Sequence, residues 1–411
     1  MVFKVFAYMK IALLQSGNQG FFPRFYNDLS KVVERRGDIL KLFVPNTGVN
    51  NRRKLSNQVI WGNRFNWHLH YYLYRLTGLQ DVWSVISTMN LVRKLKEYSP
   101  DVINLHVVND CNLCMPLLVR YINKHAVPVV WTFHDTRAFT GRCACFDEVN
   151  CEKWRTGCYN CPKDNHWLTK SLIDNSRLEW IIRRKLFNAI SKLTIVTPSE
   201  WLADFVRNSF FKDKDIVVVN NGIDTCEFAK KRDCSLVNIP CSNKKIILGV
   251  ASVWNKSKGL DTMLWLSQKL IGDYQVVLLG RITDEQKKLM PNNILCLPPT
   301  STKDELIAIY QKADVFVNPT LADNFPTVNI EALASGLPVI TYKTGGSAEC
   351  LNEKCGIAVD KGDRQALLKA IYTVCAHPEI YTKENSIKRS QNYSLAQFDK
   401  YVELYHQVSG K

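Results

Sequence analysis

Two carboxylates lie eight positions apart in the segment NPTLADNFPTVNIEALASG, one in a predicted loop and one on the predicted helix that follows. Asp323 is the loop carboxylate and Glu331 the helical one. Open parallel sheets bind ligands at the carboxyl ends of their strands, and the free N–H groups at a helix N-terminus suit a diphosphate. The turn that would hold the diphosphate comprises Asn324, Phe325, Pro326, Thr327 and Val328.

These residue types predict a nucleotide site. Glu331 can accept two hydrogen bonds from a ribose diol, and Asp323 can meet the hydroxyls of a transferred sugar. The alternative is a plain helix whose first turns carry acids because the helix dipole favours them.

Five of the 14 cysteines fall within nineteen residues, and four of these have the spacing C-x7-C-x6-C-x2-C. They are Cys143, Cys151, Cys158 and Cys161. In a reducing cytoplasm this pattern favours a structural Zn site over disulfides, and the Cys-x2-Cys pair has the spacing of a metal knuckle. The alternative is a group of packed thiols. No catalytic metal is expected, because no Asp-x-Asp motif stands out.

The elements that must position these residues form two successive series of strands and helices. Runs such as VINL and VPVVWTF are apolar without alternation, which is typical of strands covered on both faces. In the first series, strands are predicted at 10–15, 39–45, 102–106, 127–133 and 193–197, with helices at 21–37, 84–98 and 200–206. In the second, strands are predicted at 244–252, 273–280, 292–298, 314–320, 338–342 and 356–360, with helices at 258–270, 302–313, 327–336 and 363–376.

Two such series predict two doubly wound α/β domains. We expect an N-terminal domain at 1–222, which contains a Cys-rich loop at 143–161. A nucleotide-sugar-binding domain is expected at 223–388, and a C-terminal segment at 389–411 whose helix packs back on the first domain.

Charge and hydropathy limit the classes of partner. The 54 Lys and Arg against 38 Asp and Glu give a formal net charge of +16, which fits nucleic acid, an anionic membrane surface or phosphorylated small molecules. No apolar run is long enough to span a bilayer. Lys10 interrupts the N-terminal apolar stretch, so KIALLQ is interpreted as a strand and the protein as cytoplasmic.

The carboxylate segment resembles family 4 of the retaining glycosyltransferases, which have the GT-B fold. That family carries Glu-x7-Glu followed by A-x-A-x-G-x-P-V-I, and this chain reads Asp323-x7-Glu331 and then ALASGLPVI. The segments IVTPSEWLADF and NNGID also match family signatures, and WTFHDTRAFTGRCACF resembles the bacterial colanic-acid, exopolysaccharide and O-antigen transferases. The resemblance implies two Rossmann-like domains that face each other across a cleft.

The resemblance also implies roles for further residues. Lys258 in NKSKGLD matches the lysine that neutralises the donor diphosphate, and Lys256 could supply the charge of a family arginine that is Val253 here. His134 matches a histidine near the donor sugar. Gly17 and Gly20 lie where the family uses a Gly-rich turn beside the diphosphate. Glu331 would bind the ribose, and Asp323 would lie near the sugar and its phosphate.

The sequence therefore predicts a retaining hexosyltransferase. It would use a nucleotide-diphosphate sugar and a lipid-linked saccharide acceptor in bacterial surface polysaccharide synthesis, for example of O-antigen lipopolysaccharide, capsule or exopolysaccharide. The segment RFNWHLHYYLYRL has an interfacial composition and predicts peripheral association with the inner face of the cytoplasmic membrane, unless it is a helix packed in its domain.

Three alternatives remain: a nucleotide-sugar epimerase of the GT-B fold, an inactive sugar-binding relative, and a nucleic-acid-binding protein. No basic helix of regular spacing and no aromatic stacking platform supports the last, so no nucleic acid is expected.

Overall fold

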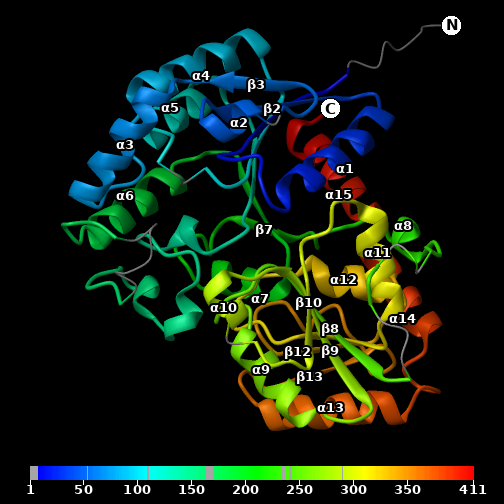
Figure 1. The fold of residues 1–411 in the computed structure, drawn as a ribbon. Coiled ribbons are helices and arrows are strands. Elements are labelled where there is room, and N and C mark those ends of the chain that lie inside the picture. Colours follow the sequence, from blue (N-terminus) through cyan, green and yellow to red (C-terminus); the bar gives the residue numbers. More distant parts are fainter. Residues whose placement is uncertain are drawn as a thin grey trace, which may run out of the picture. The chain divides into compact units, whose positions relative to one another are not determined.

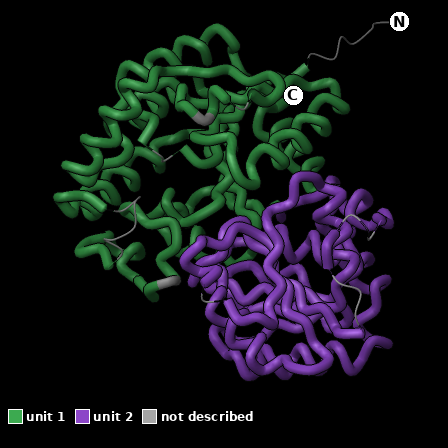
Figure 2. Tube along the Cα trace, in the orientation of Figure 1, with its two compact units in different colours: residues 1–219, 397–411 green, residues 220–396 purple. Residues whose placement is uncertain are grey.

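The computed structural model describes residues 8–52, 54–108, 111–162, 170–233, 235, 237–239, 243–288 and 290–411. These fall into two compact units, one of residues 1–219 and 397–411 and the other of residues 220–396 (Figure 2). The expected boundaries lay after residues 222 and 388. Part of the N-terminal stretch interpreted above, residues 1–7, lies outside the described residues.

The first unit has a parallel sheet with the order β3-β2-β1-β4-β5-β6-β7 in the described part of the chain (Figure 1). Its strands are β1 (Lys10–Leu14), β2 (Ile39–Pro45), β3 (Gln58–Trp61), β4 (Val102–Leu105), β5 (Val129–Thr132), β6 (Leu193–Thr197) and β7 (Asp215–Val218). Its helices are α1 (Phe22–Arg35), α2 (Gly48–Arg52), α3 (Arg64–Thr77), α4 (Val85–Tyr98), α5 (Met115–His125), α6 (Ser176–Asn188), α7 (Glu200–Arg207) and nearly all of α15 (Ala396–Ser409). The central strands β1, β4 and β5 are almost wholly buried, as their unbroken apolar runs predict.

The second unit has a parallel sheet with the order β10-β9-β8-β11-β12-β13. Its strands are β8 (Lys245–Val253), β9 (Tyr274–Arg281), β10 (Ile294–Leu297), β11 (Val315–Asn318), β12 (Val339–Tyr342) and β13 (Gly356–Val359). Its helices are α8 (Thr225–Ala229), α9 (Leu260–Lys269), α10 (Asp284–Lys288), α11 (Lys303–Lys312), α12 (Thr327–Ala334), α13 (Arg364–Ala376) and α14 (Lys383–Ser390). Both sheets contain the doubly wound order 3-2-1-4-5-6, so the predicted fold class is confirmed.

The last helix, α15, packs on α1 of the first unit (Figure 1). Asp399 accepts hydrogen bonds from Arg35 and Arg36, and the rings of Phe25 and Phe398 lie 5.2 Å apart. The chain thus returns to the first unit after it has completed the second.

Sequence analysis did not predict several elements, among them β3, β7, α5 and α6. The two strands are four residues long, which is too short to show a clear pattern. Helix α6 buries a stripe that includes Glu179 and Arg183 among its apolar residues, and these charges obscure the helical periodicity. Arg183 is paired with Asp81 at 2.7 Å and with Glu179 at 3.3 Å, so the buried charges compensate one another.

Candidate functional site

The turn between β11 and α12 carries Asp323 and is fixed by neighbouring backbone. Gly345 has φ 54°, and a Cβ on it would lie 1.6 Å from the Asp323 carbonyl oxygen, so only glycine fits. The Gly346 amide donates to the Asn324 carbonyl at 2.9 Å. Asn329, on α12, donates to the Ser347 carbonyl at 3.0 Å. The pair Gly345 and Gly346 thus lets two loops meet.

Lys258 and Asp323 form an ion pair, with Nζ 2.7 Å from Oδ2. They are 65 positions apart in the chain. The β8–α9 turn lies against the β11–α12 turn, since the Leu321 amide donates to the Ser257 carbonyl at 2.7 Å. A Cβ at Gly259, whose φ is 77°, would lie 2.2 Å from the Pro319 carbonyl oxygen. Two predicted site residues from different turns are thus brought into contact.

Glu331 is 5% exposed, and its Oε2 accepts a hydrogen bond from the Tyr310 hydroxyl at 3.2 Å. It lies on α12, whose N-cap is Pro326 and whose N-terminus has no side-chain cap. The first amides of a helix have no partner within it, so this N-terminus suits an anion.

The predicted turn residues differ in exposure. Phe325 and Pro326 have buried side chains, and the Phe325 ring packs 5.6 Å from that of Tyr393. These two can offer a ligand only their backbone. Asn324, Thr327 and Val328 are half-buried, whereas Lys256 is exposed.

In the first unit, His134 follows β5 and is half-buried. Its Nε2 lies 2.8 Å from Nδ1 of His106, and the two rings stack at 5.1 Å. Burial lowers the pKa of His134 to about 4 and that of His106 well below its usual value. Both imidazoles are therefore neutral at neutral pH. Sequence reasoning missed His106, although its place at the end of a buried strand was a usable signal.

A cavity in the first unit lies beside the β1–α1 loop and α3. Its volume is about 360 Å³, and its lining includes Ser16, Gly17, Trp67 and Tyr71. The rings of Trp67 and Tyr71 are stacked at 6.2 Å with an interplanar angle of 19°. Ser16 is buried, and its Oγ has no hydrogen-bond partner in the described part of the chain. Gly20, at φ 64°, has open space around it and is not among the lining residues.

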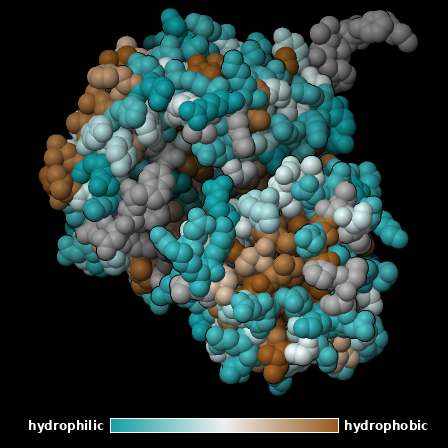
Figure 3. Space-filling view, in the orientation of Figure 1, coloured by the Kyte–Doolittle hydropathy of each residue, from teal (hydrophilic) through white to brown (hydrophobic). Residues whose placement is uncertain are grey.

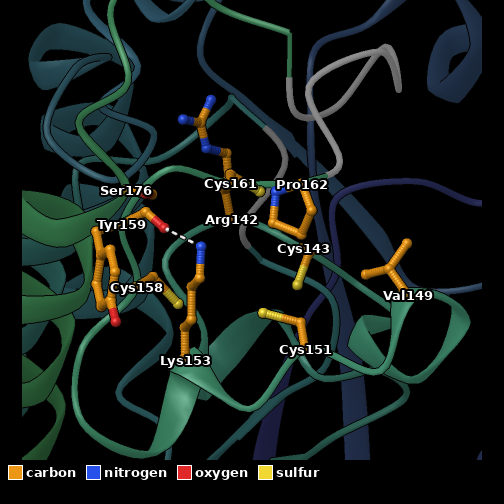
Figure 4. Close-up of a pocket in the computed structure, with 10 residues that line it drawn as sticks. All are labelled: Arg142, Cys143, Val149, Cys151, Lys153, Cys158, Tyr159, Cys161, Pro162 and Ser176. Atoms are coloured by element: carbon orange, nitrogen blue, oxygen red, sulfur yellow. Dashed lines mark hydrogen bonds between the residues drawn. The ribbon is translucent and has the colours of Figure 1, made fainter.

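The predicted metal ligands line one small cavity (Figure 4). Cys143, Cys151, Cys158 and Cys161 all face it, and its volume is about 20 Å³. The Gly141 amide donates to Cys158 Sγ at 3.0 Å. Within the described ranges, no group of three His, Cys, Asp or Glu side chains lies close enough together to hold a metal ion. The four thiols line one cavity, and metal binding stays a prediction.

Helix α3 has an exposed apolar stripe made of Phe65, Leu69, Tyr72 and Leu76, which we call the α3 stripe. Val85, Ile86 and Met89 of α4 are exposed as well. Figure 3 shows hydrophobic residues over the edge of the first unit where Figure 1 draws these helices. The polar Asn66 and His70 of α3 are buried instead. Of the helices described, none has the length and apolar character that a membrane crossing requires.

Comparisons with known proteins match both units. Glycosyltransferase Family 4 matches residues 24–227, and Glycosyl transferases group 1 matches residues 238–391. The putative colanic acid biosynthesis glycosyl transferase WcaC of Escherichia coli K12 is 28% identical over 270 residues. That match covers 64% of this chain and 64% of WcaC, so the chain spans somewhat less than two thirds of that relative.

Solved glycosyltransferases share the whole architecture. One from Rickettsia africae superposes with a TM-score of 0.67 at 16% identity, covering 98% of this chain and 99% of that one. Anabaena HepE in complex with UDP-glucose superposes with a TM-score of 0.64 at 14% identity, covering 96% and 98%. With a family match on each unit and a shared fold, this chain belongs to glycosyltransferase family 4 and has the GT-B fold.

Proposed function

We propose that the protein transfers a hexose-type sugar from a nucleotide-diphosphate sugar to a saccharide hydroxyl, with retention of the anomeric configuration. The contact between Lys258 and Asp323 beside the N-terminus of α12 carries the proposal. It places a cation, a carboxylate and a helix start at the carboxyl ends of β8 and β11, where parallel sheets bind ligands. HepE, with the same fold, was solved with UDP-glucose, which supports a nucleotide-sugar donor.

The site chemistry follows from where charge develops. When the anomeric bond breaks, negative charge grows on the β-phosphate, and Lys258 and the amides at the start of α12 would stabilise it. Asp323 pairs with Lys258, so a bound diphosphate would compete with that carboxylate for the lysine. Displaced from the lysine, Asp323 would accept hydrogen bonds from the donor sugar. Glu331, buried on α12, would bind the ribose diol.

The acceptor saccharide would occupy the cavity of the first unit. Stacked aromatic rings such as those of Trp67 and Tyr71 offer apolar faces to a sugar ring. Hydroxyl and amide side chains, among them Ser16, Thr47 and Gln19, offer hydrogen bonds to its hydroxyls.

We further propose that this acceptor is lipid-linked and that the protein associates peripherally with the inner face of the cytoplasmic membrane. The α3 stripe supports this, since an exposed apolar helix face flanked by basic residues suits an anionic lipid surface. The same helix contributes Trp67 and Tyr71 to the cavity. The place of WcaC in colanic acid synthesis supports a role in surface polysaccharides such as O-antigen or capsule.

A donor panel tests the function. Thermal unfolding should be measured with UDP-, GDP-, ADP- and CDP-sugars, and we expect one base to stabilise the protein by ligand linkage. The stabilising donor should then yield a new glycosidic product with a saccharide acceptor. An epimerised sugar formed without acceptor would establish the epimerase alternative, and binding without turnover would establish an inactive sugar-binding relative. If no nucleotide sugar binds, the proposal is wrong.

A further inference from the structure

A further cavity of the first unit opens at the amino ends of its strands, and we call it the amino-end cavity. Its volume is about 430 Å³, and its lining comes from β1, β2, β3 and the last turns of α4, together with Tyr8. It shares no lining residue with the cavity proposed for the acceptor, which follows the carboxyl ends of β1 and β2. Because open parallel sheets bind their substrates at the carboxyl ends of the strands, the amino-end cavity is separate from the proposed reaction.

The pleat of the sheet explains which side chains face this cavity. Ile39, Lys41 and Phe43 of β2 are spaced two apart, so they lie on one face of the sheet. Lys10 of β1 is the register partner of Ile39, and Val59 of β3 is that of Phe43. All five residues line the cavity, so two lysines lie beside an apolar surface.

Three lysines of the cavity have no carboxylate partner in the part of the chain that the structure describes. They are Lys10, Lys41 and Lys94, and each is half-buried. Glu97 is the acidic residue among the described lining residues, and its Oε1 lies 3.7 Å from Nε of Arg93. The cavity therefore carries an excess of positive charge.

The two carboxylates beside these strand ends pair with the C-terminal segment. Asp38 Oδ2 lies 2.8 Å from His406 Nε2, and Asp101 Oδ1 lies 2.8 Å from Lys411 Nζ. Asp101 Oδ2 accepts a hydrogen bond from the backbone amide of Lys10 at 2.9 Å. These contacts direct the nearby acids away from the ammonium groups that line the cavity.

Tyr98 holds two of the ammonium groups near one ring. Its hydroxyl donates to the Ile39 carbonyl at 3.1 Å, which fixes the ring against the sheet. Lys41 Nζ lies 4.7 Å from the ring centroid, and Lys10 Nζ lies 6.0 Å from it. The ring attracts each cation, whereas the two cations repel each other. An anion bound between them would relieve this repulsion.

We propose that the amino-end cavity is a binding site for a diphosphate group. A phosphate monoester carries at most about two negative charges near neutral pH, so three ammonium groups match a diphosphate better. Lysine suits this ligand because its ammonium group acts as a point charge toward phosphate oxygens. The apolar surface of Ile39, Phe43 and Val59 leaves room for the carrier of the diphosphate, which is a lipid chain or a nucleoside.

Calorimetric titration of the full chain with inorganic pyrophosphate tests the site. The background is Lys258→Gln, so that the proposed donor site does not contribute. Adding Lys41→Gln and Lys94→Gln should weaken binding at least about tenfold, because two charge-assisted contacts are lost. The matched control adds Lys124→Gln and Lys185→Gln, two exposed lysines of the same unit, and should leave the affinity unchanged. Equal weakening in both pairs, or no binding in the background, would overturn the proposal.

Glu97→Gln provides a test that loss of folding cannot mimic. This exposed carboxylate repels an anion in the cavity, so its removal should tighten pyrophosphate binding. Thermal unfolding shows whether the lysine pair variant is folded. Weaker binding in Glu97→Gln would contradict the proposal.

The carrier of the diphosphate is identified with UDP and farnesyl diphosphate in the same background. A loss of farnesyl diphosphate affinity in the lysine pair variant would identify a lipid carrier, and a loss of UDP affinity a nucleoside. If neither probe loses affinity, the proposal is wrong. Each readout is binding without sugar transfer, so the result stands apart from the proposed function.

Discussion

At the residue scale, the ion pair of Lys258 and Asp323 explains why this chain tolerates an aspartate where the family carries a glutamate. At 2.7 Å the shorter side chain already reaches the lysine. Its backbone is held by the Gly345 turn, which permits no Cβ at that position. The carboxylate and the lysine are each partly exposed, so solvent weakens the attraction and a diphosphate can displace it.

We predict that Glu331→Gln weakens binding of the product nucleotide diphosphate about 30-fold. This corresponds to roughly 2 kcal/mol, the worth of a charged acceptor on a buried diol. Asp323→Asn should keep that affinity and slow sugar transfer, because Asp323 is expected to meet the sugar and leaves Lys258 for the diphosphate. Calorimetric titration and turnover assays on both variants provide the measurement.

The matched control is Asp360→Asn, an exposed carboxylate of the same unit that pairs with Lys343. It should alter neither property. If Asp323→Asn loses nucleotide affinity while Glu331→Gln keeps it, the two roles are reversed. Full activity in both variants would remove the main support for the proposed site.

At the element scale, the Cys-rich loop is fixed on α6. The Trp180 indole donates to the Trp154 carbonyl at 2.9 Å, and Arg183 donates to the carbonyls of Arg137 and Thr140 at 2.8 Å each. The loop therefore has a firm base on which four thiols meet around one cavity (Figure 4).

We predict that these thiols hold one Zn in the protein as purified. The cavity of about 20 Å³ can hold one small species, and four thiolates would close a tetrahedral site with no open position. Elemental analysis without chelator should find about one equivalent, and Cys158→Ser should lose it. The control is Cys226→Ser, an exposed cysteine of the second unit. Less than about a tenth of an equivalent in wild type would establish packed thiols instead.

The α3 stripe leads to a second prediction at this scale. Phe65 and Tyr72 are largely exposed, so Phe65→Ser with Tyr72→Ser should leave thermal stability nearly unchanged. The double variant should lose flotation with anionic liposomes at low salt, which wild type should show. Tyr372→Ser, at an exposed aromatic of α13, serves as the control. If the wild-type protein does not float with the liposomes, α3 does not bind the membrane.

At the scale of the whole molecule, the sequence predicted what depends on local pattern and missed what depends on distant contacts. Strands β4 and β5 and the capped helix α11 were predictable, because strand burial and helix capping depend on residues that are neighbours in the sequence. The contact of Lys258 with Asp323 could be expected from the resemblance, but not its geometry. The buried hydrogen bond from the Tyr405 hydroxyl to Asn104 could not be predicted, because these residues lie 301 positions apart.

Three histidines of the first unit are kept neutral by burial, and this gives the whole fold a pH dependence. The pKa of His70 and that of His134 are lowered to about 4, and that of His106 is lowered well below its usual value. In the unfolded chain these histidines are protonated as the pH falls through about 6.5, whereas in the folded chain they are protonated only at lower pH. The stability they contribute is complete above about pH 6.5 and is lost as the pH falls toward 4. Burial beside Asp81 raises the pKa of Glu179, which acts in the opposite direction.

We predict that the free energy of unfolding falls as the pH is lowered from about 7 to 5. The slope of this free energy against pH reports the protons taken up on unfolding, and His70→Gln should reduce that number by about one. His70 is 1% exposed, with Nδ1 2.7 Å from the Ser84 hydroxyl and Nε2 2.7 Å from the Gln80 carbonyl. Its share of the loss is roughly 2 kcal/mol over that range, at 1.36 kcal/mol for each pKa unit. Urea unfolding across the range measures the slope, with His125→Gln, at an exposed histidine, as the control. An unchanged slope in His70→Gln would mean that His70 takes up its proton in the folded protein, and that burial does not lower its pKa.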